Sequence, residues 1–194
     1  ATPQSEALLG EQLAALHRVT AARFGWHRDN TIGATPQPNA WLSEWPAFYA
    51  QRRLGFQLDL AAAGGHGGGW LDRGRPLCER VGDFFASYHP RPSLLHGDLW
   101  GGNWAVDRGG APVLYDPAVC YGDREADLAM TQLFGGFGTR FYDAYQAAWP
   151  LDPGAGQRRD LYNLYHVLNH LNLFGGGYRG QAQAMIERLL AELG

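Results

Sequence analysis

Apolar residues recur every three or four positions along most of this chain, and this spacing predicts helices that bury one face. The clearest pattern covers 161–174, where five apolar side chains share a face: Leu161, Leu164, Tyr165, Leu168 and Leu171. Similar spacing predicts further helices over 5–19, 45–60, 71–88, 124–134, 141–149 and 181–193. Ser5 is expected to cap the first of them, and Pro76 to lie near the first turn of the helix over 71–88.

The middle of the chain has a different pattern. Residues 104–106 and 113–115 predict two short strands, joined by a Gly-containing turn at 107–110. Residues 24–46 contain three prolines and predict a long irregular stretch, and the Gly-rich run 64–69 predicts a connector. The expected fold class is therefore α+β, mostly helical, with one small β-hairpin.

Length and composition suit one globular domain or one lobe of a larger protein. The 194 residues are 45% hydrophobic, yet no apolar run approaches the roughly 18 residues of a membrane span, and no secretory leader is visible. The net charge of −3 gives no electrostatic argument for nucleic acid. Cys78 and Cys120 fit free, buried thiols better than a disulfide. We expect a cytoplasmic protein that binds neither nucleic acid nor membrane.

All 16 basic residues are arginine, and the lack of lysine excludes two common chemistries. A P-loop needs its lysine to reach the phosphates, and Schiff-base and pyridoxal enzymes need one for the covalent adduct. None of the four serines lies in a Gly-x-Ser-x-Gly sequence, so the nucleophile elbow of many hydrolases is excluded as well.

The segment 96–116 carries the most specific chemical signal. Asp98 is followed five residues later by Asn103 and eighteen later by Asp116, with the predicted hairpin between the last two. Phosphoryl transfer needs a carboxylate to accept the proton of the attacking hydroxyl, and an amide oxygen and a second carboxylate to hold Mg²⁺. The alternative is that Asp98 and Asn103 only cap turns in a Gly-rich loop. The order of the three residues favours a kinase.

Two long motifs carry a resemblance to a known family. LLHGDLWGGN at 94–103 and YDPAVCYGDREADLAM at 115–130 closely resemble the fructosamine kinase (ketosamine 3-kinase) family, a group of kinase-like small-molecule phosphotransferases. Further matches lie at 16–17, 24–25, 29–39, 133–137 and 161–178, so the resemblance covers nearly the whole chain. It implies a fold like the C-terminal, substrate-binding lobe of protein kinases and aminoglycoside phosphotransferases.

The resemblance also implies a role for each matching residue. Asp98 would be the catalytic base, and Asn103 and Asp116 the magnesium ligands, with ATP as co-substrate. Trp100 would line the sugar-amine pocket, although ordinary core packing explains an aromatic residue there equally well. His96 and Asp127 would support the catalytic loop. Gly101 stands where the family usually has Ser, a change expected to alter loop stiffness more than chemistry.

The front of the chain departs from the family. Relatives begin with a strand-rich nucleotide-binding lobe that carries a phosphate-covering loop and a Lys, whereas residues 1–194 correspond to the C-terminal lobe alone. The implied activity is ATP-dependent phosphorylation of the sugar 3-hydroxyl of a free or protein-bound ketosamine, with this fragment inactive unless an N-terminal lobe is present. The alternatives are a kinase for another small hydroxylated amine, such as an aminoglycoside or choline, and a catalytically silent binding module.

Three other patterns predict structure in place of function. The run 175–180 fits Gly-x-Gly-x-x-Gly but follows a helix, so a helix terminus is favoured over dinucleotide binding. His166 and His170 have the spacing of zinc ligands, but no Glu sits beside His166, so buried and hydrogen-bonded side chains are favoured. The arginine pairs at 52–53 and 158–159 are expected on solvated faces.

Overall fold

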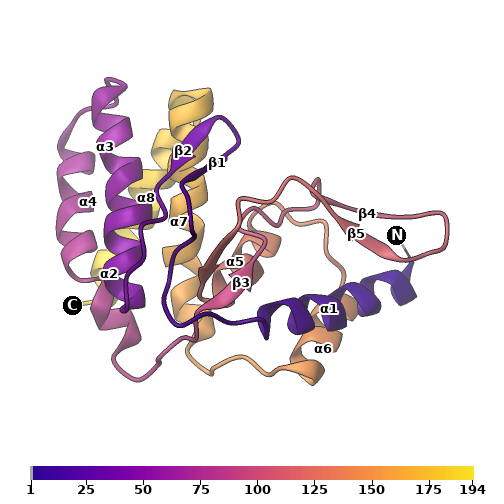
Figure 1. Cartoon of the computed structure of the whole chain (residues 1–194). Helices are drawn as coiled ribbons and strands as arrows, with labels where there is room; N and C mark the ends of the chain where they lie inside the picture. Colours follow the sequence, from indigo (N-terminus) through magenta and orange to yellow (C-terminus); the bar gives the residue numbers. More distant parts are fainter. Residues whose placement is uncertain (1) are drawn as a thin grey trace.

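The computed structural model describes residues 2–194 and centres on one long helix, α7 (Ala155–Phe174). Helices α3 (Phe56–Ala63) and α8 (Arg179–Glu192) pack beside it together with α5 (Glu125–Leu133). Figure 1 shows α7 in the middle of the molecule, with the helical half on one side and the β4–β5 hairpin projecting on the other. The predicted helix over 161–174 is thus the core of the fold.

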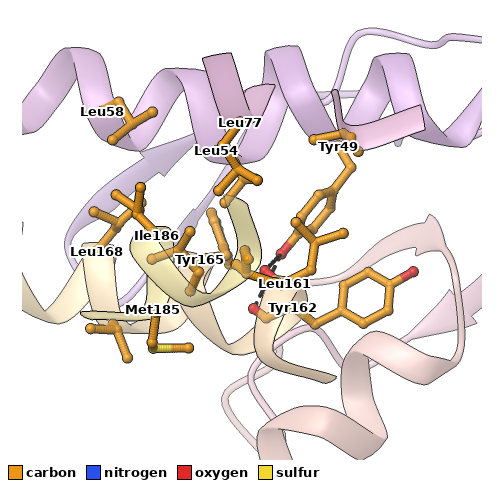
Figure 2. Packing of buried hydrophobic residues seen from close by; sticks show 14 of the residues in the cluster. Tyr49, Leu54, Leu58, Leu77, Leu161, Tyr162, Tyr165, Leu168, Met185 and Ile186 are labelled. Carbon is orange, nitrogen blue, oxygen red and sulfur yellow. Dashed lines mark hydrogen bonds between the residues drawn. The ribbon is translucent and has the colours of Figure 1, made fainter. Parts of the chain in front are cut away.

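The helical half adds four shorter elements around α7. These are α2 (Trp45–Tyr49), a π-helical turn η1 (Ala50–Gly55), α4 (Gly69–Glu79) and a 3₁₀ turn η2 (Val81–Phe85). Figure 2 shows side chains of α2, η1 and α4 meeting those of α7 and α8, with Leu54, Leu77, Leu161 and Ile186 in one cluster. The Tyr49 hydroxyl donates to the carbonyl oxygens of Leu161 and Tyr162, which ties α2 to α7 through a buried polar contact.

The other half is built on a close pair of helices, α1 (Pro3–His17) and α6 (Thr139–Ala148). Gly10 permits the close approach, because a Cβ atom there would lie 2.3 Å from the carbonyl oxygen of Phe141. A second core of Leu9, Leu13, Leu99 and Trp104 forms between this helix pair and the neighbouring loop.

The strands form three separate antiparallel pairs. They are β1 (Asn30–Ile32) with β2 (Thr35–Gln37), β3 (Ser93–Leu95) with β6 (Cys120–Gly122), and β4 (Trp104–Val106) with β5 (Pro112–Leu114). The last pair confirms the predicted hairpin, in the register Trp104 opposite Leu114. Pairing Leu95 with Cys120 brings the two ends of segment 96–119 together. This segment is therefore a long loop that begins and ends at the β3–β6 pair.

A mostly helical α+β fold is confirmed. The prediction of a single β-hairpin was wrong, because the described residues form three strand pairs. The stretch 24–46 contains the β1–β2 hairpin in addition to loops. The helix predicted over 45–60 is interrupted by the π-helical turn at Ala50–Gly55. The helix predicted over 71–88 ends at Glu79, and Pro76 lies deep inside it, not near its first turn. Residues 175–180 do follow a helix end, with Gly175 as its cap at φ 89°.

Details at the surface and ends also differ from the sequence predictions. Thr2, not Ser5, caps α1, and Ser5 is the third residue of the helix that completes the capping box. Cys78 and Cys120 are free thiols, half-buried and buried. Among the helices of residues 2–194, none combines the length and the apolar character needed to cross a bilayer.

Candidate active site

Loop 96–103 follows β3 and is held in a compact form by its own hydrogen bonds. The Asn103 side-chain nitrogen donates to the Asp98 carbonyl oxygen at 2.8 Å and to the Asp98 carboxylate at 3.3 Å. The backbone N–H of Asn103 donates to the carbonyl oxygen of Trp100. The amide of Asn103 therefore closes the loop and fixes the carboxyl group of Asp98 at its centre.

Asp98 is half-buried, and its surroundings raise its affinity for a proton. Burial raises the pKa of its carboxyl group above the ordinary value, and this effect outweighs the lowering by His96, His170 and the Asn103 hydrogen bond. None of the ion pairs in residues 2–194 involves Asp98. A carboxylate with a raised pKa and no permanent cation beside it is suited to accept a proton.

Asn103 and Asp116 are brought to the same end of the β4–β5 hairpin. The N–H of Tyr115 donates to the carbonyl oxygen of Asn103 at 3.1 Å, which continues the ladder one step beyond Trp104 and Leu114. Asp116 comes next, exposed, at φ 52°, which makes it the one non-glycine residue of the described chain with a positive φ. Aspartate tolerates this conformation better than most residues.

The donor set of this hairpin end is compatible with a magnesium ion. With its nitrogen turned to Asp98, the Asn103 side-chain oxygen accepts none of the hydrogen bonds recorded for residues 2–194, and neither does the Asp116 carboxylate. Hard oxygen atoms free of donors are what Mg²⁺ binds, completed by phosphate and water. His, Cys, Asp and Glu side chains form no cluster of three or more metal ligands in the described part of the chain.

Asp127 connects loop 96–103 to the helices. Its carboxylate accepts the backbone N–H groups of His96 and Gly97, each at 2.8 Å, and the His17 side chain at 3.0 Å. Burial by itself would raise the pKa of Asp127, but the hydrogen bonds that its carboxylate accepts from the His17 side chain and the Gly97 N–H hold that pKa below its usual value. The charged carboxylate is thus the form that the fold stabilises.

His96 links the two halves of the candidate site. Its Nε2 lies 2.9 Å from the carbonyl oxygen of Tyr115, and its Nδ1 accepts the backbone N–H of Asp98 at 3.3 Å. Because a carbonyl can only accept, the proton of the ring is on Nε2. One imidazole therefore spans from the residue before Asp116 to the backbone of Asp98.

We expect Asp127→Asn to lower the free energy of unfolding at pH 7 by about 2 kcal/mol, because a buried acceptor of three N–H groups loses its charge and one oxygen. The lowered pKa of Asp127 contributes stability above the ordinary Asp range that is lost as pH falls through the folded-state value. Urea unfolding from pH 7 to pH 3 should show the two proteins converging in acid. A constant difference at all pH values would contradict this assignment.

Trp100 lies at the edge of the loop with 41% of its surface exposed, and its ring covers Gly102. Core packing, the alternative for this residue, is thereby excluded. The backbone of Gly101 touches that of Gly135 and Gly136, so a Cβ at position 101 would lie 3.1 Å from the Gly135 carbonyl oxygen. The glycine that replaces the usual family serine therefore allows a backbone contact with the loop after α5.

His170 lies near the candidate site, although its sequence pattern favoured only a structural role. His170 lies close enough to influence Asp98, and it packs against the aromatic rings of Phe134, Phe174 and Tyr178. The Nδ1 of His170 bonds the His166 carbonyl oxygen, so the prediction of a hydrogen-bonded side chain is confirmed for His170. The buried Nδ1 of His166 has no partner in residues 2–194, so the prediction is wrong for that atom of His166. The i, i+4 spacing of His166 and His170 is the one feature of the sequence that could have drawn attention to His170.

The prediction of solvated arginine pairs was wrong for one residue of each pair. Arg53 and Arg158 are each only 3% exposed. Arg158 forms a two-pronged ion pair with Glu125 at 2.7 and 3.0 Å, and Arg53 donates to the Pro38 carbonyl and the Asn39 side chain. Long side chains that satisfy their donors internally can be buried, and local sequence does not reveal those partners.

Solved structures establish the class of fold. A candidate fructosamine-3-kinase from Thermobifida fusca matches with a TM-score of 0.91 and 36% identity, over 98% of this chain and 66% of that one. A second, from Haemophilus somnus, matches with a TM-score of 0.88 and 31% identity, over 98% of this chain and 64% of that one. The fold is therefore that of a substantial part of these proteins.

Sequence comparison establishes the family. The profile of the fructosamine kinase family matches residues 1–192. A probable ketoamine kinase of Synechocystis is 52% identical over 94% of this chain and 61% of that protein, and the chloroplastic protein-ribulosamine 3-kinase of Arabidopsis thaliana is 46% identical over 97% and 58%. This chain belongs to the fructosamine kinase family, and it spans about three fifths of the length of these relatives.

Proposed function

We propose that this chain is the catalytic, C-terminal lobe of a kinase that phosphorylates the sugar 3-hydroxyl of ketosamines. The observation that carries the proposal is the assembly of Asp98, Asn103 and Asp116 at one end of the β4–β5 hairpin in a member of the fructosamine kinase family. Relatives named ketoamine kinase and protein-ribulosamine 3-kinase support the same class of substrate.

Asp98 accepts the proton of the substrate hydroxyl as its oxygen attacks the γ-phosphorus of ATP, and ADP leaves. The raised pKa of Asp98 favours this transfer, and the Asn103 hydrogen bond keeps the carboxylate oriented. Magnesium, held by the oxygens of Asn103 and Asp116, would neutralise charge on the phosphates. Trp100 offers an exposed aromatic face for the sugar or its cationic amine.

His96 and Asp127 act as supports in this proposal. Asp127 accepts the N–H groups of His96 and Gly97, just before Asp98, at 2.8 Å, and the His96 ring accepts the N–H of Asp98. Both side chains are buried. Exposed apolar side chains at Val113 and Tyr115 on the hairpin are consistent with a further lobe covering this side. The phosphate-covering loop and the Lys that bind ATP belong to that lobe.

The proposal predicts that residues 1–194 alone transfer phosphate at least about 10³-fold more slowly than the same chain joined to an N-terminal lobe of a relative, because positioning and charge stabilisation of the phosphates dominate this chemistry. The measurement is phosphate transfer from ATP to a synthetic fructosamine, with ³¹P NMR used to detect the product phosphorylated on the 3-hydroxyl. Choline and an aminoglycoside serve as competing substrates.

Each result separates the candidate functions. Product at the 3-position of the ketosamine supports the proposal. Selective phosphorylation of choline or the aminoglycoside would replace it with another small-molecule kinase. Ketosamine binding without transfer by the joined protein would indicate a silent binding module. Full activity of residues 1–194 alone would contradict the need for a second lobe.

A further inference from the structure

A buried chain of hydrogen bonds leaves α5, passes through α6 and α1, and returns to α5. Arg124, at the start of α5, donates from Nη1 to the Tyr145 hydroxyl at 3.0 Å, and that hydroxyl lies 2.8 Å from His17 Nδ1. His17 Nε2 lies 3.0 Å from the Asp127 carboxylate. All four side chains are at most 7% exposed. The chain ends at the carboxylate that holds the backbone of loop 96–103.

The directions of these hydrogen bonds determine where the His17 proton lies. Arg124 can only donate, so the Tyr145 oxygen accepts from it. Among the hydrogen bonds of residues 2–194, the Tyr145 hydroxyl proton then has one acceptor, His17 Nδ1. A proton on Nδ1 would leave that hydroxyl proton without an acceptor in a buried site. The imidazole therefore presents a lone pair to Tyr145 and its N–H at Nε2 to Asp127.

Arg124 is itself fixed at the far end of the chain. Its guanidinium donates to the carbonyl oxygens of Trp149 and Pro150 at 2.8 and 2.5 Å and lies 4.0 Å from the centre of the Trp149 ring. No carboxylate in residues 2–194 forms an ion pair with it. The Nη1 that donates to the Trp149 carbonyl oxygen also donates to the Tyr145 hydroxyl, so the bonds to the end of α6 fix its direction.

The spacing of α1 and α6 makes this contact possible. Gly10 lies two helical turns before His17, and Phe141 lies one turn before Tyr145. Because Gly10 lets the two backbones touch at Phe141, the next turns of the same faces bring the His17 ring and the Tyr145 hydroxyl within hydrogen-bond distance. The helix pair is thus arranged around this buried polar contact.

We propose that Tyr145 and Arg124 are positioning residues for loop 96–103. They hold the His17 ring with Nε2–H toward Asp127, so that the Asp127 carboxylate stays directed at the N–H groups of His96 and Gly97, next to Asp98. Neither residue approaches the reacting groups. The effect on turnover rests on the function proposed above, whereas the effect on the loop does not.

The test compares Tyr145→Phe with Tyr142→Phe, the same chemical change three residues away on α6. Tyr142 bonds Thr131 at 3.0 Å and is outside the chain of hydrogen bonds to Asp127. Amide hydrogen exchange of the full chain should show protection of the His96 and Gly97 amides falling about tenfold in Tyr145→Phe, beyond any change in global stability, and unchanged in the control. A uniform loss at all amides, or an equal loss in both variants, would overturn the proposal.

Two further measurements keep the proposal testable if Tyr145→Phe does not fold. Arg124→Lys should produce the same selective loss at the two amides, since an ammonium cannot reach its three acceptors as the planar fork does. In the unaltered chain, the ¹⁵N shifts of His17 should be those of a ring protonated at Nε2 only; a proton on Nδ1 contradicts the proposal directly.

Turnover gives the functional readout in the chain joined to an N-terminal lobe. We expect kcat of Tyr145→Phe to fall several-fold with a smaller change in the KM for ATP. The affected amides of His96 and Gly97 adjoin Asp98, whereas Asn103 is held separately by the Tyr115 N–H. If kcat is unchanged although the His96 and Gly97 amides have lost protection from exchange, the position of the loop does not affect catalysis. If no variant or parent protein phosphorylates a ketosamine while the exchange pattern holds, the proposed function fails and the positioning of the loop stands.

Discussion

Replacing Asp98 by Asn should lower kcat for ketosamine phosphorylation by about 10²–10⁴-fold in the chain joined to an N-terminal lobe, because the proton acceptor is lost. The KM for ATP should change little, since Asp98 is not among the proposed phosphate or magnesium ligands. Asn is isosteric and can still accept the Asn103 hydrogen bond, so the unfolding midpoint should stay within a few degrees of the parent.

The pH dependence of the parent enzyme adds a second check on Asp98. Burial raises the pKa of its carboxyl group, so the acid limb of kcat should lie above the value of about 4 expected for an exposed aspartate. Asp143→Asn, an exposed change on α6, is the matched control and should leave both rate and profile unchanged. A turnover of Asp98→Asn equal to that of the control at saturating ATP would remove Asp98 from the role of base.

Replacing Gly97 by Ala should destabilise the chain by at least about 3 kcal/mol and abolish turnover. Gly97 has φ 83°, and a Cβ atom would lie 2.0 Å from the Ala118 carbonyl oxygen, well inside contact distance. That oxygen cannot move freely, because the Gln37 side chain donates to it at 3.1 Å. Relief therefore requires moving loop 96–103 away from Ala118, in the segment just before β6, which also breaks the Gly97 hydrogen bond to Asp127.

Gly110→Ala is the control that separates the two causes. Gly110 has nearly the same φ, 86°, but nothing lies within 4 Å of the position of its Cβ. Its substitution should lower the free energy of unfolding by only about 1 kcal/mol, because only the backbone preference against a positive φ is involved. Urea unfolding of both variants measures the difference. Equal costs at the two positions would show that Ala118 can yield, and that the loop is less tightly held than the structure indicates.

Both predictions concern a loop whose geometry depends on distant segments. Asp98 is set by Asn103 within the same loop, but the backbone on its N-terminal side is held by Asp127 on α5, and Asp127 in turn by His17 on α1. If the proposed function holds, a substitution in α1 or α6 can therefore lower activity without any change to the residues proposed to contact substrate. Screening variants for turnover alone would misassign such residues as catalytic.

The amino-acid sequence by itself determined the features that depend on near neighbours in the chain. Helix α7 follows from apolar residues spaced three and four apart, and the β4–β5 hairpin from two short apolar runs around a glycine turn. The motif from His96 to Asn103 is contiguous, so its residues and their order were visible without a structure. The resemblance to the fructosamine kinase family was likewise visible in contiguous motifs, above all 94–103 and 115–130.

Only the tertiary structure decided the contacts between distant segments. The pairing of Leu95 with Cys120, the 110-residue separation of His17 and Asp127, and the burial of Arg53 and Arg158 leave no periodic trace in the sequence. Strands β3 and β6 are three residues each and pair across the whole of segment 96–119, so no short turn marks them in the sequence. The physical reason is that such a strand, like a buried arginine, is stabilised by partners from distant parts of the fold, so its state depends on the whole chain and not on its neighbours.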